Sequence, residues 1–263
     1  MTVPTELVVI DAFTDRPFSG NPAAVCRLDR PASEAWMQDV AAEMHLSETA
    51  YVLDRPEGDY DLRWFTPTTE VAFCGHATLA TAHLLGGGRF HTRSGVLACT
   101  VHRDGSIDMD FPADPPVPRA VPDGLFAALG TDGDVHTGAS DLMVVVADAD
   151  TVQRLAPDLT ALAAVEARAV IVTAASDQPG VDCASRVFAP RVGIPEDPVT
   201  GSAHCTLAPF WSDRTGRQEL VGAQLSARGG TVHMRLDGDR VIIGGRAVTV
   251  SEVRLLSDPD WLR

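Results

Sequence analysis

One passage of the sequence is written twice, and it holds the side chains best suited to chemistry. Both copies, residues 63–80 and 186–208, run arginine, any residue, phenylalanine, any residue, proline, and then place a glutamate five residues before a glycine. These residues are Glu70 and Gly75 in the first copy and Glu196 and Gly201 in the second. A short polar residue, an alanine and an apolar stretch follow each glycine, which is typical of a helix N-terminus with exposed backbone amides. The repeat predicts two facing anion sites.

Cys74 and Thr200 stand directly before these glycines. The helix dipole favours the thiolate at such a position, so Cys74 is a candidate base or nucleophile, and an inert core cysteine is an equal alternative. His76 falls in the first turn, where the dipole disfavours an imidazolium. We expect a neutral histidine there, either functional or bonded to local backbone.

The remaining polar candidates are ambiguous by themselves. Glu48 alone looks like a surface glutamate. Glu196 and Asp197 precede a proline, which fits a turn, and helix amides could equally hold them. One residue separates Ser202 from His204 on an expected helix. Their side chains therefore point about 200° apart and cannot form a nucleophile–base pair. No GxSxG motif supports a serine hydrolase.

Charge and residue types exclude several classes of function. A net charge of -15 without a basic stripe argues against nucleic acid as a partner. All 21 basic residues are arginine, which excludes a pyridoxal phosphate Schiff base and a Walker phosphate loop. The sequence contains neither HExxH nor a GxGxxG after its first strand, so we expect no metal and no cofactor.

The cysteines and the N-terminus indicate where the protein works. The five cysteines are odd in number, widely spaced and without a CxxC pair, which predicts free, reduced thiols. No basic segment precedes the first apolar stretch, and no apolar run approaches the roughly 18 residues of a membrane span. We expect a cytoplasmic protein with no membrane contact.

Periodicity predicts the same order of elements in both halves. In the first half we expect strands at 6–13, 23–28, 49–53 and 60–65, a helix at 34–46 with Ser33 as its N-cap, and a helix from Gly75 to the glycines at 86–88. In the second half we expect strands at 142–147, 169–173, 182–188 and within 231–253, a helix within 150–164, and a helix after Gly201.

Two proline features complete this picture. A proline-rich stretch, 112–124, is expected to act as a semi-rigid connector between the halves. Pro209 lies inside the second repeated helix, so that helix should either end near Ala208 or kink there. We therefore predict an α/β (α+β) protein with two similar domains, 1–116 and 117–263, whose last strand is able to return to the first half.

Motifs spread over nearly the whole chain resemble the phenazine-biosynthesis PhzF-like family, related in fold to diaminopimelate epimerase. They are DAFTDRPFSGNPAAV, LSETAYV, RWFTPTTEVAFCGHATLATAHLL, SRVFAPRVGIPEDPVTGSAHCTLAPFW and QLSARGG. The resemblance implies two domains, each a strongly curved, mostly antiparallel sheet around a central helix, with the active site in the cleft between them. It also implies a homodimer.

The resemblance further implies roles for particular residues. Glu48 would shuttle a proton, with His76, Asp197 and Ser202 as its catalytic partners. Substrate contacts would come from Asn21, Cys74, Gly75, Thr200, Gly201, Gly229 and Gly230. The related epimerases use one cysteine from each half, whereas this chain has Cys74 opposite Thr200, which disfavours a symmetrical two-thiol mechanism.

Three hypotheses follow. The first is a cofactor-independent isomerase that moves a proton within a small carboxylic acid, whose carboxylate binds the amides after Gly75 and Gly201. The second is an amino-acid epimerase or racemase with Cys74 as one of two bases. The third is a non-catalytic protein that binds a small-molecule carboxylate.

Overall fold

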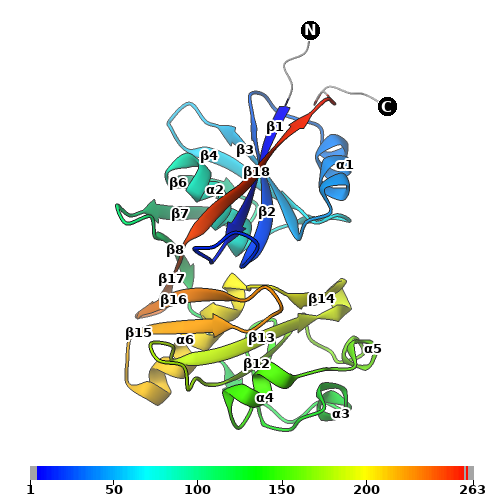
Figure 1. Ribbon diagram of the computed structural model, residues 1–263, viewed down its shortest axis with the longest axis vertical. Helices are drawn as coiled ribbons and strands as arrows, with labels where there is room; N and C mark the ends of the chain where they lie inside the picture. Colours follow the sequence, from blue (N-terminus) through cyan, green and yellow to red (C-terminus); the bar gives the residue numbers. More distant parts are fainter. Residues whose placement is uncertain (1–4, 258, 260–263) are drawn as a thin grey trace. The chain divides into compact units, whose positions relative to one another are not determined.

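The computed structural model describes residues 5–257 and 259, and the chain divides into two compact units (Figure 1). The first combines Met1–Asp110 with Gly244–Arg263, and the second is Phe111–Ile243. These limits differ from the expected halves, 1–116 and 117–263. The C-terminal strand β18 pairs antiparallel with β1, which places it in the first unit.

In the described part of the chain, the first unit holds two helices together with strands from both ends of the sequence. Its elements are β1 (Thr5–Ala12), β2 (Asn21–Leu28), α1 (Glu34–Met44), β3 (Glu48–Asp54), β4 (Tyr60–Phe65), β5 (Glu70–Val71), α2 (Gly75–Leu85), β6 (Gly88–Thr92), β7 (Gly95–Val101), β8 (Ile107–Pro112) and β18 (Ala247–Leu255). The chain leaves this unit within β8 and returns to it within β17 (Arg240–Gly245).

The second unit has one long helix and several short ones. Its elements are β9 (Val117–Pro118), α3 (Leu125–Leu129), β10 (Asp134–Thr137), β11 (Leu142–Val145), α4 (Ala149–Arg154), α5 (Leu159–Leu162), β12 (Val170–Ala175), β13 (Cys183–Ala189), the 3-10 helix η1 (Pro190–Val192), β14 (Ile194–Asp197), α6 (Gly201–Thr215), β15 (Glu219–Gln224) and β16 (Gly230–Asp237).

The two units repeat the same strand pairing. In the first, β2–β3 is parallel, β3–β4 antiparallel, β4–β6 parallel and β6–β7 antiparallel. In the second, β11–β12, β12–β13, β13–β15 and β15–β16 follow in the same order of directions. Mixed sheets with few helices confirm the predicted α+β class, and the repeated sequence corresponds to the repeated β4–β5–α2 and β13–β14–α6 segments.

Burial explains which helix occupies the centre of the first unit. Every residue from Gly75 to Ala82 is buried, and α2 contacts β1, β2 and β3. A helix that is buried on all sides needs apolar or small side chains on every face. The alanines, threonines and leucine of this segment meet that need. Helix α1 instead packs one stripe, including Trp36 and Val40, against Ala24 and Tyr51 of the same sheet. In Figure 1, α1 and α2 lie on different sides of β2 and β3.

The helix ends follow the sequence signals. Ser33 caps α1, because its side chain accepts a hydrogen bond from the Trp36 amide. Helix α2 stops at Gly86, whose φ of 82° lies in the left-handed region that glycine adopts freely. In the second unit, α3, α4 and α5 contribute Leu125, Val152 and Leu162 to a separate apolar cluster.

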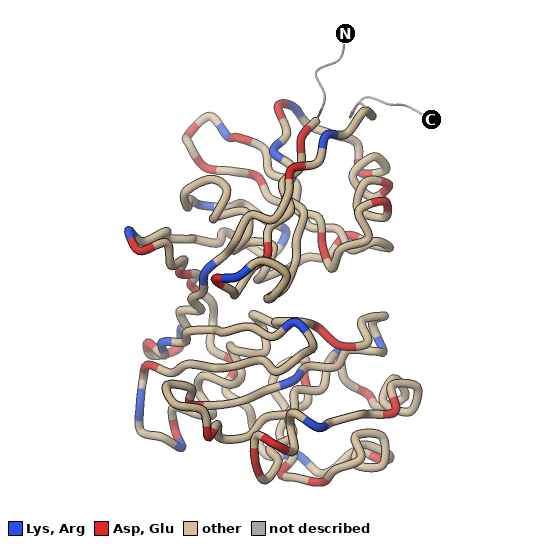
Figure 2. The backbone as a smooth tube through the Cα atoms, in the orientation of Figure 1, with Lys and Arg blue, Asp and Glu red and all other residues tan. Residues whose placement is uncertain are grey.

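The surface and the cysteines agree with the sequence reading. Acidic side chains outnumber arginines, and Figure 2 shows the arginines scattered along both units without a continuous basic stripe in the described part of the chain. All five cysteines are free and buried. Among the described residues, no helix is long and apolar enough to cross a membrane.

Helix α6 continues past Pro209, and the carbonyl that loses its helical N–H donor has another donor. The helix continues to Thr215, so of the two outcomes expected at Pro209, an end near Ala208 is excluded. Proline has no N–H for the carbonyl four residues before it, and here the carbonyl of Cys205 accepts a bond from the Asp114 amide at 3.0 Å. The Asp114 carboxylate also accepts from Thr206 Oγ1 (2.9 Å) and from the Ala139 amide (2.9 Å). The connector therefore docks on α6 where the proline leaves room for it.

This docking predicts a stability cost for Asp114→Ala. The change removes two side-chain bonds and should lower the free energy of unfolding by about 1–3 kcal/mol, because Thr206 and Ala139 lose their acceptor. Urea unfolding measures this cost. The matched change at exposed Asp123, in the same connector, should stay within about 0.5 kcal/mol of the parent protein, and equal losses at the two positions would contradict this role of Asp114.

Candidate active site

Three residues that are separated in sequence meet in the first unit. Glu48 begins β3, Cys74 is the N-cap of α2, and His76 lies in its first turn. His76 Nε2 is 3.1 Å from Glu48 Oε2, and His76 Nδ1 is 3.6 Å from Cys74 Sγ. The three residues are 9%, 4% and 5% exposed for Glu48, His76 and Cys74. Glu48 is thus a buried acid paired with an imidazole, and the reading of an isolated surface glutamate was wrong.

Asn21 completes this cluster from the neighbouring strand. Its Nδ2 lies 3.1 Å from His76 Nδ1. Strand β2 runs parallel to β3 with Ala23 opposite Glu48, so the first residue of β2 lies beside the start of β3. The turn before Asn21 requires glycine, because Gly20 has a φ of 66° and a Cβ there would lie 2.1 Å from the Ala12 carbonyl oxygen.

The charge of His76 differs from the sequence prediction. Burial lowers its pKa, but contacts with Cys74 and Glu48 outweigh burial and raise the pKa well above the ordinary value. We had expected a neutral ring from the helix dipole, whose partial charge is weaker than a carboxylate at 3.1 Å. The structure therefore favours an imidazolium paired with the Glu48 carboxylate.

Asn21 can serve both charge states of the ring. A neutral ring protonated on Nε2 keeps its 3.1 Å contact with the Glu48 carboxylate and accepts the Asn21 amide at Nδ1, as the atoms are placed here. An imidazolium needs the Asn21 amide turned so that its oxygen faces Nδ1. Amide nitrogen and oxygen have nearly the same shape, so this turn fits the same space. The site can hold the extra proton or release it.

The thiol of Cys74 is protonated at neutral pH. Burial raises its pKa to about 11, with a further increase from Glu48. The predicted thiolate at the helix N-terminus is therefore not favoured, because the loss of water and a nearby negative charge outweigh the dipole. Cys74 can donate its S–H to His76 Nδ1 only when the ring is neutral, because an imidazolium has no acceptor.

Glu48, Cys74 and His76 also supply the three ligand types that zinc uses. One atom from each lies within 4.8 Å of the others. The imidazole, however, turns Nδ1 toward the sulfur and Nε2 toward the carboxylate. One ion cannot take all three ligands without rotation of this ring, because the imidazole lies between the thiol and the carboxylate and turns a different nitrogen to each.

A second cluster forms in the other unit around the start of α6. Asp197 Oδ2 accepts from Thr200 Oγ1 at 2.6 Å. Gln224, on β15, accepts the Thr200 amide at 2.9 Å and donates to the Asp197 carbonyl at 2.7 Å. Gln224 was missing from the sequence prediction, although it is the first residue of the QLSARGG motif.

Ser202 lies beside a residue that sequence reasoning also missed. Arg168 Nη2 donates to Ser202 Oγ at 3.2 Å, and the same guanidinium holds both oxygens of Asp141. Ser202 therefore has an arginine partner. Arg168 lies far upstream of Ser202 and outside the repeat, so no spacing in the sequence could indicate this contact.

The two predicted glycines, Gly229 and Gly230, lie at the turn between β15 and β16. The Gly229 amide donates to Ser226 Oγ at 3.0 Å, and Gly230 pairs with Gln224 across the ladder. Their place next to Gln224 connects them to the Asp197–Thr200 cluster.

Helices α2 and α6 begin in the same unusual way. Neither Cys74 nor Thr200 caps its helix with a side-chain bond, and the Thr200 hydroxyl is engaged by Asp197. First-turn amides that have no capping side chain suit an anion. Anion binding after Gly75 and after Gly201 stays a prediction for each unit.

The arginine and glutamate of each repeat form a clamp just before the helix. Arg63 holds Glu70 with two bonds of 2.7 Å, and Arg186 holds Glu196 with bonds of 2.7 and 2.9 Å. Each guanidinium also stacks over the phenylalanine of its motif, at 5.2 and 5.0 Å from the ring centre. These pairs tie β5 to β4 and β14 to β13, so the repeat positions the helix starts.

Matching positions in α2 and α6 also bind the N-cap carbonyl. Thr78 Oγ1 donates to the Cys74 carbonyl at 2.6 Å, and His204 Nδ1 donates to the Thr200 carbonyl at 2.8 Å. His204 is fully buried, and burial lowers its pKa to about 4 although the carbonyl bond opposes this shift. It is a neutral structural histidine.

The low pKa of His204 predicts acid sensitivity. An unfolded histidine takes up a proton near pH 6.5, whereas the folded one resists until about pH 4, so folding stability is lost as pH falls through this window. The loss is on the order of 3 kcal/mol. In His204→Gln, the free energy of unfolding should decrease less steeply between these pH values than in the parent protein. In His233→Gln, which changes an exposed histidine, the decrease should match that of the parent protein. An unchanged slope in His204→Gln would contradict the assignment.

Comparison with solved structures first defines the class of fold. A hydroxyproline epimerase from Agrobacterium vitis shares the fold with a TM-score of 0.62 at 12% identity, over 97% of this chain and 94% of that one. A PhzF-family phenazine biosynthesis protein from Enterococcus faecalis is much closer, with a TM-score of 0.92 and 40% identity over 97% of this chain and all of the other. The chain thus has the fold that these two proteins share.

Sequence comparison then gives the family. The family model described as phenazine biosynthesis-like protein matches residues 10–253. An uncharacterized isomerase of Pseudomonas aeruginosa is 50% identical over 247 residues, which is 90% of this chain and 93% of the relative. The chain belongs to the phenazine biosynthesis-like, or PhzF, family, and its named relatives support an isomerase role at the level of the family.

Proposed function

We propose that this protein is an isomerase that moves a proton within a small carboxylic acid without a cofactor. The observation that carries the proposal is the buried pair of Glu48 and His76 at the start of α2. A carboxylate that lies beside an imidazole in a buried place is a candidate for a general base. The family assignment supports the same class of reaction.

The proposed chemistry uses Glu48 as a proton carrier. Its carboxylate takes a proton from a substrate carbon, and the C–H electron pair moves into the substrate to form a new double bond as the existing one shifts. Glu48 then returns the proton to a different carbon. The reaction balances without an oxidant, a reductant or a leaving group.

His76 makes this shuttle possible in a buried place. Its positive charge offsets the cost of holding the Glu48 carboxylate away from water. When Glu48 carries the substrate proton, this attraction is lost and Asn21 can stabilise the ring in either state. The uncapped amides at the start of α2 would hold the substrate carboxylate.

Asp197 and Ser202 belong to the same proposal. The Thr200 hydroxyl orients the Asp197 carboxylate, and Arg168 orients the Ser202 hydroxyl. Lower kcat in Asp197→Asn and in Ser202→Ala would support a part in the reaction. The homodimer that the family resemblance implies is also proposed, and sedimentation analysis tests it.

An epimerase that uses Cys74 is the second candidate. It is favoured by one contact, the 3.6 Å between Cys74 Sγ and His76 Nδ1, which gives the thiol proton a receiver when the ring is neutral. The raised pKa of the thiol weighs against it. A protein that binds carboxylates without turnover is the third candidate, and the buried base argues against it.

The proposal predicts the behaviour of Glu48→Gln. A panel of small amino and cyclic carboxylic acids in D2O should show deuterium incorporation with the parent protein, and the substitution should slow incorporation by about 100-fold or more, because glutamine cannot accept the proton. Mass spectrometry measures the incorporated deuterium. The unfolding midpoint in urea checks that the fold is kept.

Cys74→Ser is the matched comparison in the same cluster. It should retain most of the exchange if Glu48 is the base. Exchange that survives Glu48→Gln but disappears in Cys74→Ser, with inversion of a stereocentre, would replace the isomerase by the epimerase. Binding of carboxylates without any exchange would establish the third candidate.

A further inference from the structure

A cavity in the first unit lies apart from the Glu48 cluster. It has a volume of about 570 Å³, within the range of ligand pockets, which is roughly 300–1,000 Å³. Helix α1, the chain before it, and strands β3, β4 and β6 form its walls. None of Glu48, Cys74 and His76 lines it. We call it the α1 groove.

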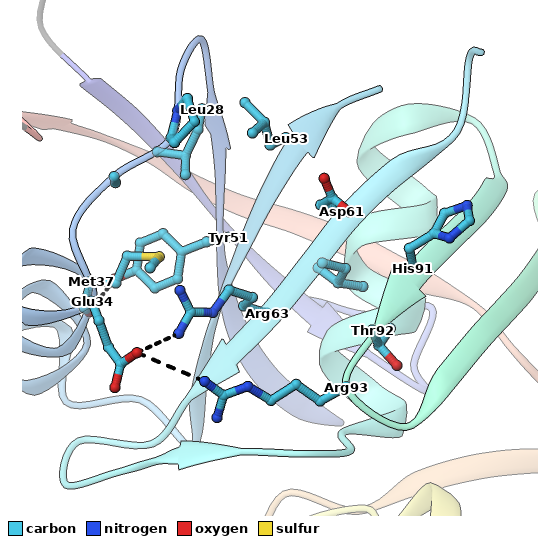
Figure 3. A pocket seen from close by; sticks show the side chains of 13 residues that line it. Leu28, Glu34, Met37, Tyr51, Leu53, Asp61, Arg63, His91, Thr92 and Arg93 are labelled. Atoms are coloured by element: carbon cyan, nitrogen blue, oxygen red, sulfur yellow. Dashed lines mark hydrogen bonds and ion pairs between the residues drawn. The ribbon is translucent and has the colours of Figure 1, made fainter. Parts of the chain in front are cut away.

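The α1 groove has an apolar side and a charged end. Pro31, Ala32 and Leu53 provide its accessible apolar surface. Leu28, Met37 and Tyr51 also line it but are buried in the core, and the Tyr51 hydroxyl is already bonded to the Met37 carbonyl. Figure 3 shows Leu28 and Leu53 at one end and the arginines at the other. A ligand that fits this groove needs an apolar body and a polar head.

The charged end is a pair of arginines that holds an internal carboxylate. Glu34 Oε2 lies 2.9 Å from Arg63 Nη2 and 3.8 Å from Arg93 Nη2, as the dashed lines of Figure 3 show. Both guanidinium groups also contact Glu70, which is almost fully buried. Arg63, Arg93 and Glu70 together carry one net positive charge, and Glu34 neutralises it.

Glu34 is poorly suited to be a permanent occupant of this place. Its side chain is 65% exposed, and exposed ion pairs contribute about 1 kcal/mol or less. It belongs to the first turn of α1, where Ser33 already caps the helix. A carboxylate from outside can therefore exchange with Glu34 at little cost, and it keeps the cluster neutral.

We propose that the α1 groove binds a small amphipathic acid, with its carboxylate on Arg63 and Arg93 in place of Glu34 and its apolar body against Pro31, Ala32 and Leu53. This site is additional to the proposed catalytic cluster. Its ligand is an organic anion with a ring or short chain, since apolar contact and charge must act together.

The test uses 2-naphthoate as the probe, with 2-naphthamide as its uncharged counterpart, and measures binding by calorimetry. The protein should bind the naphthoate severalfold more tightly than the amide, because only the carboxylate pairs with the arginines. Arg93→Met should weaken naphthoate binding severalfold, and Glu34→Gln should tighten it severalfold by removing the internal competitor.

Two controls locate the probe. Arg89→Met removes the same charge from strand β6 at a position outside the groove, and it should leave the affinity unchanged. Glu48→Gln should also leave it unchanged, so that the result is independent of the proposed isomerase activity. Both variants change surface or local contacts without removing the groove.

Several results would overturn the proposal. Naphthoate that fails to bind both the parent protein and Glu34→Gln at millimolar concentration would exclude the site. Equal affinity in Arg93→Met and the parent protein, or loss of binding in Glu48→Gln, would place the probe elsewhere. The proposal would also be rejected if a second copy of the chain covers the groove. In that case Arg93→Met would dissociate a dimer, and the monomer would bind no naphthoate.

Discussion

The interaction on which this account rests is the buried contact between Glu48 and His76. A carboxylate with 9% of its surface exposed is costly to keep ionised, and the imidazole at 3.1 Å removes much of that cost. The pair in turn requires β3 to begin beside the first turn of α2. The parallel pairing of β2 with β3 and the tight turn at Gly20 supply that placement and bring Asn21 to the other nitrogen of the ring.

The duplicated sequence explains the scaffold better than it explains the chemistry. Arg63–Glu70 and Arg186–Glu196 are equivalent clamps, and Thr78 and His204 are equivalent donors to the N-cap carbonyl. Where the copies differ, the chemistry differs too: the first unit has Cys74 and His76, and the second has Thr200 and Ser202. The repeat builds two uncapped helix starts, and the substitutions between copies give each start its own polar groups.

Much of the fold followed from local signals, and much of the site did not. Alternating strands, Ser33 and the glycines after α2 act within a few residues, so the sequence predicted them well. The family motifs indicated Glu48 and His76, but the pKa of His76 depends on a partner distant in sequence, which the local dipole argument left out. Arg168 and Gln224 reach their partners through tertiary contacts, and Pro209 is accommodated by Asp114 from the connector.

The protonation state of His76 tests its pairing with Glu48 most directly. It is measured by ¹⁵N NMR of the two ring nitrogens near pH 7, and comparison with a His76→Gln sample assigns the signals. We expect both nitrogens to carry a proton in the parent protein. We also expect the pKa of His76 to fall in Glu48→Gln, because burial lowers it and the carboxylate that raised it is gone. A ring that is neutral near pH 7 and indifferent to the loss of the Glu48 charge would contradict the account.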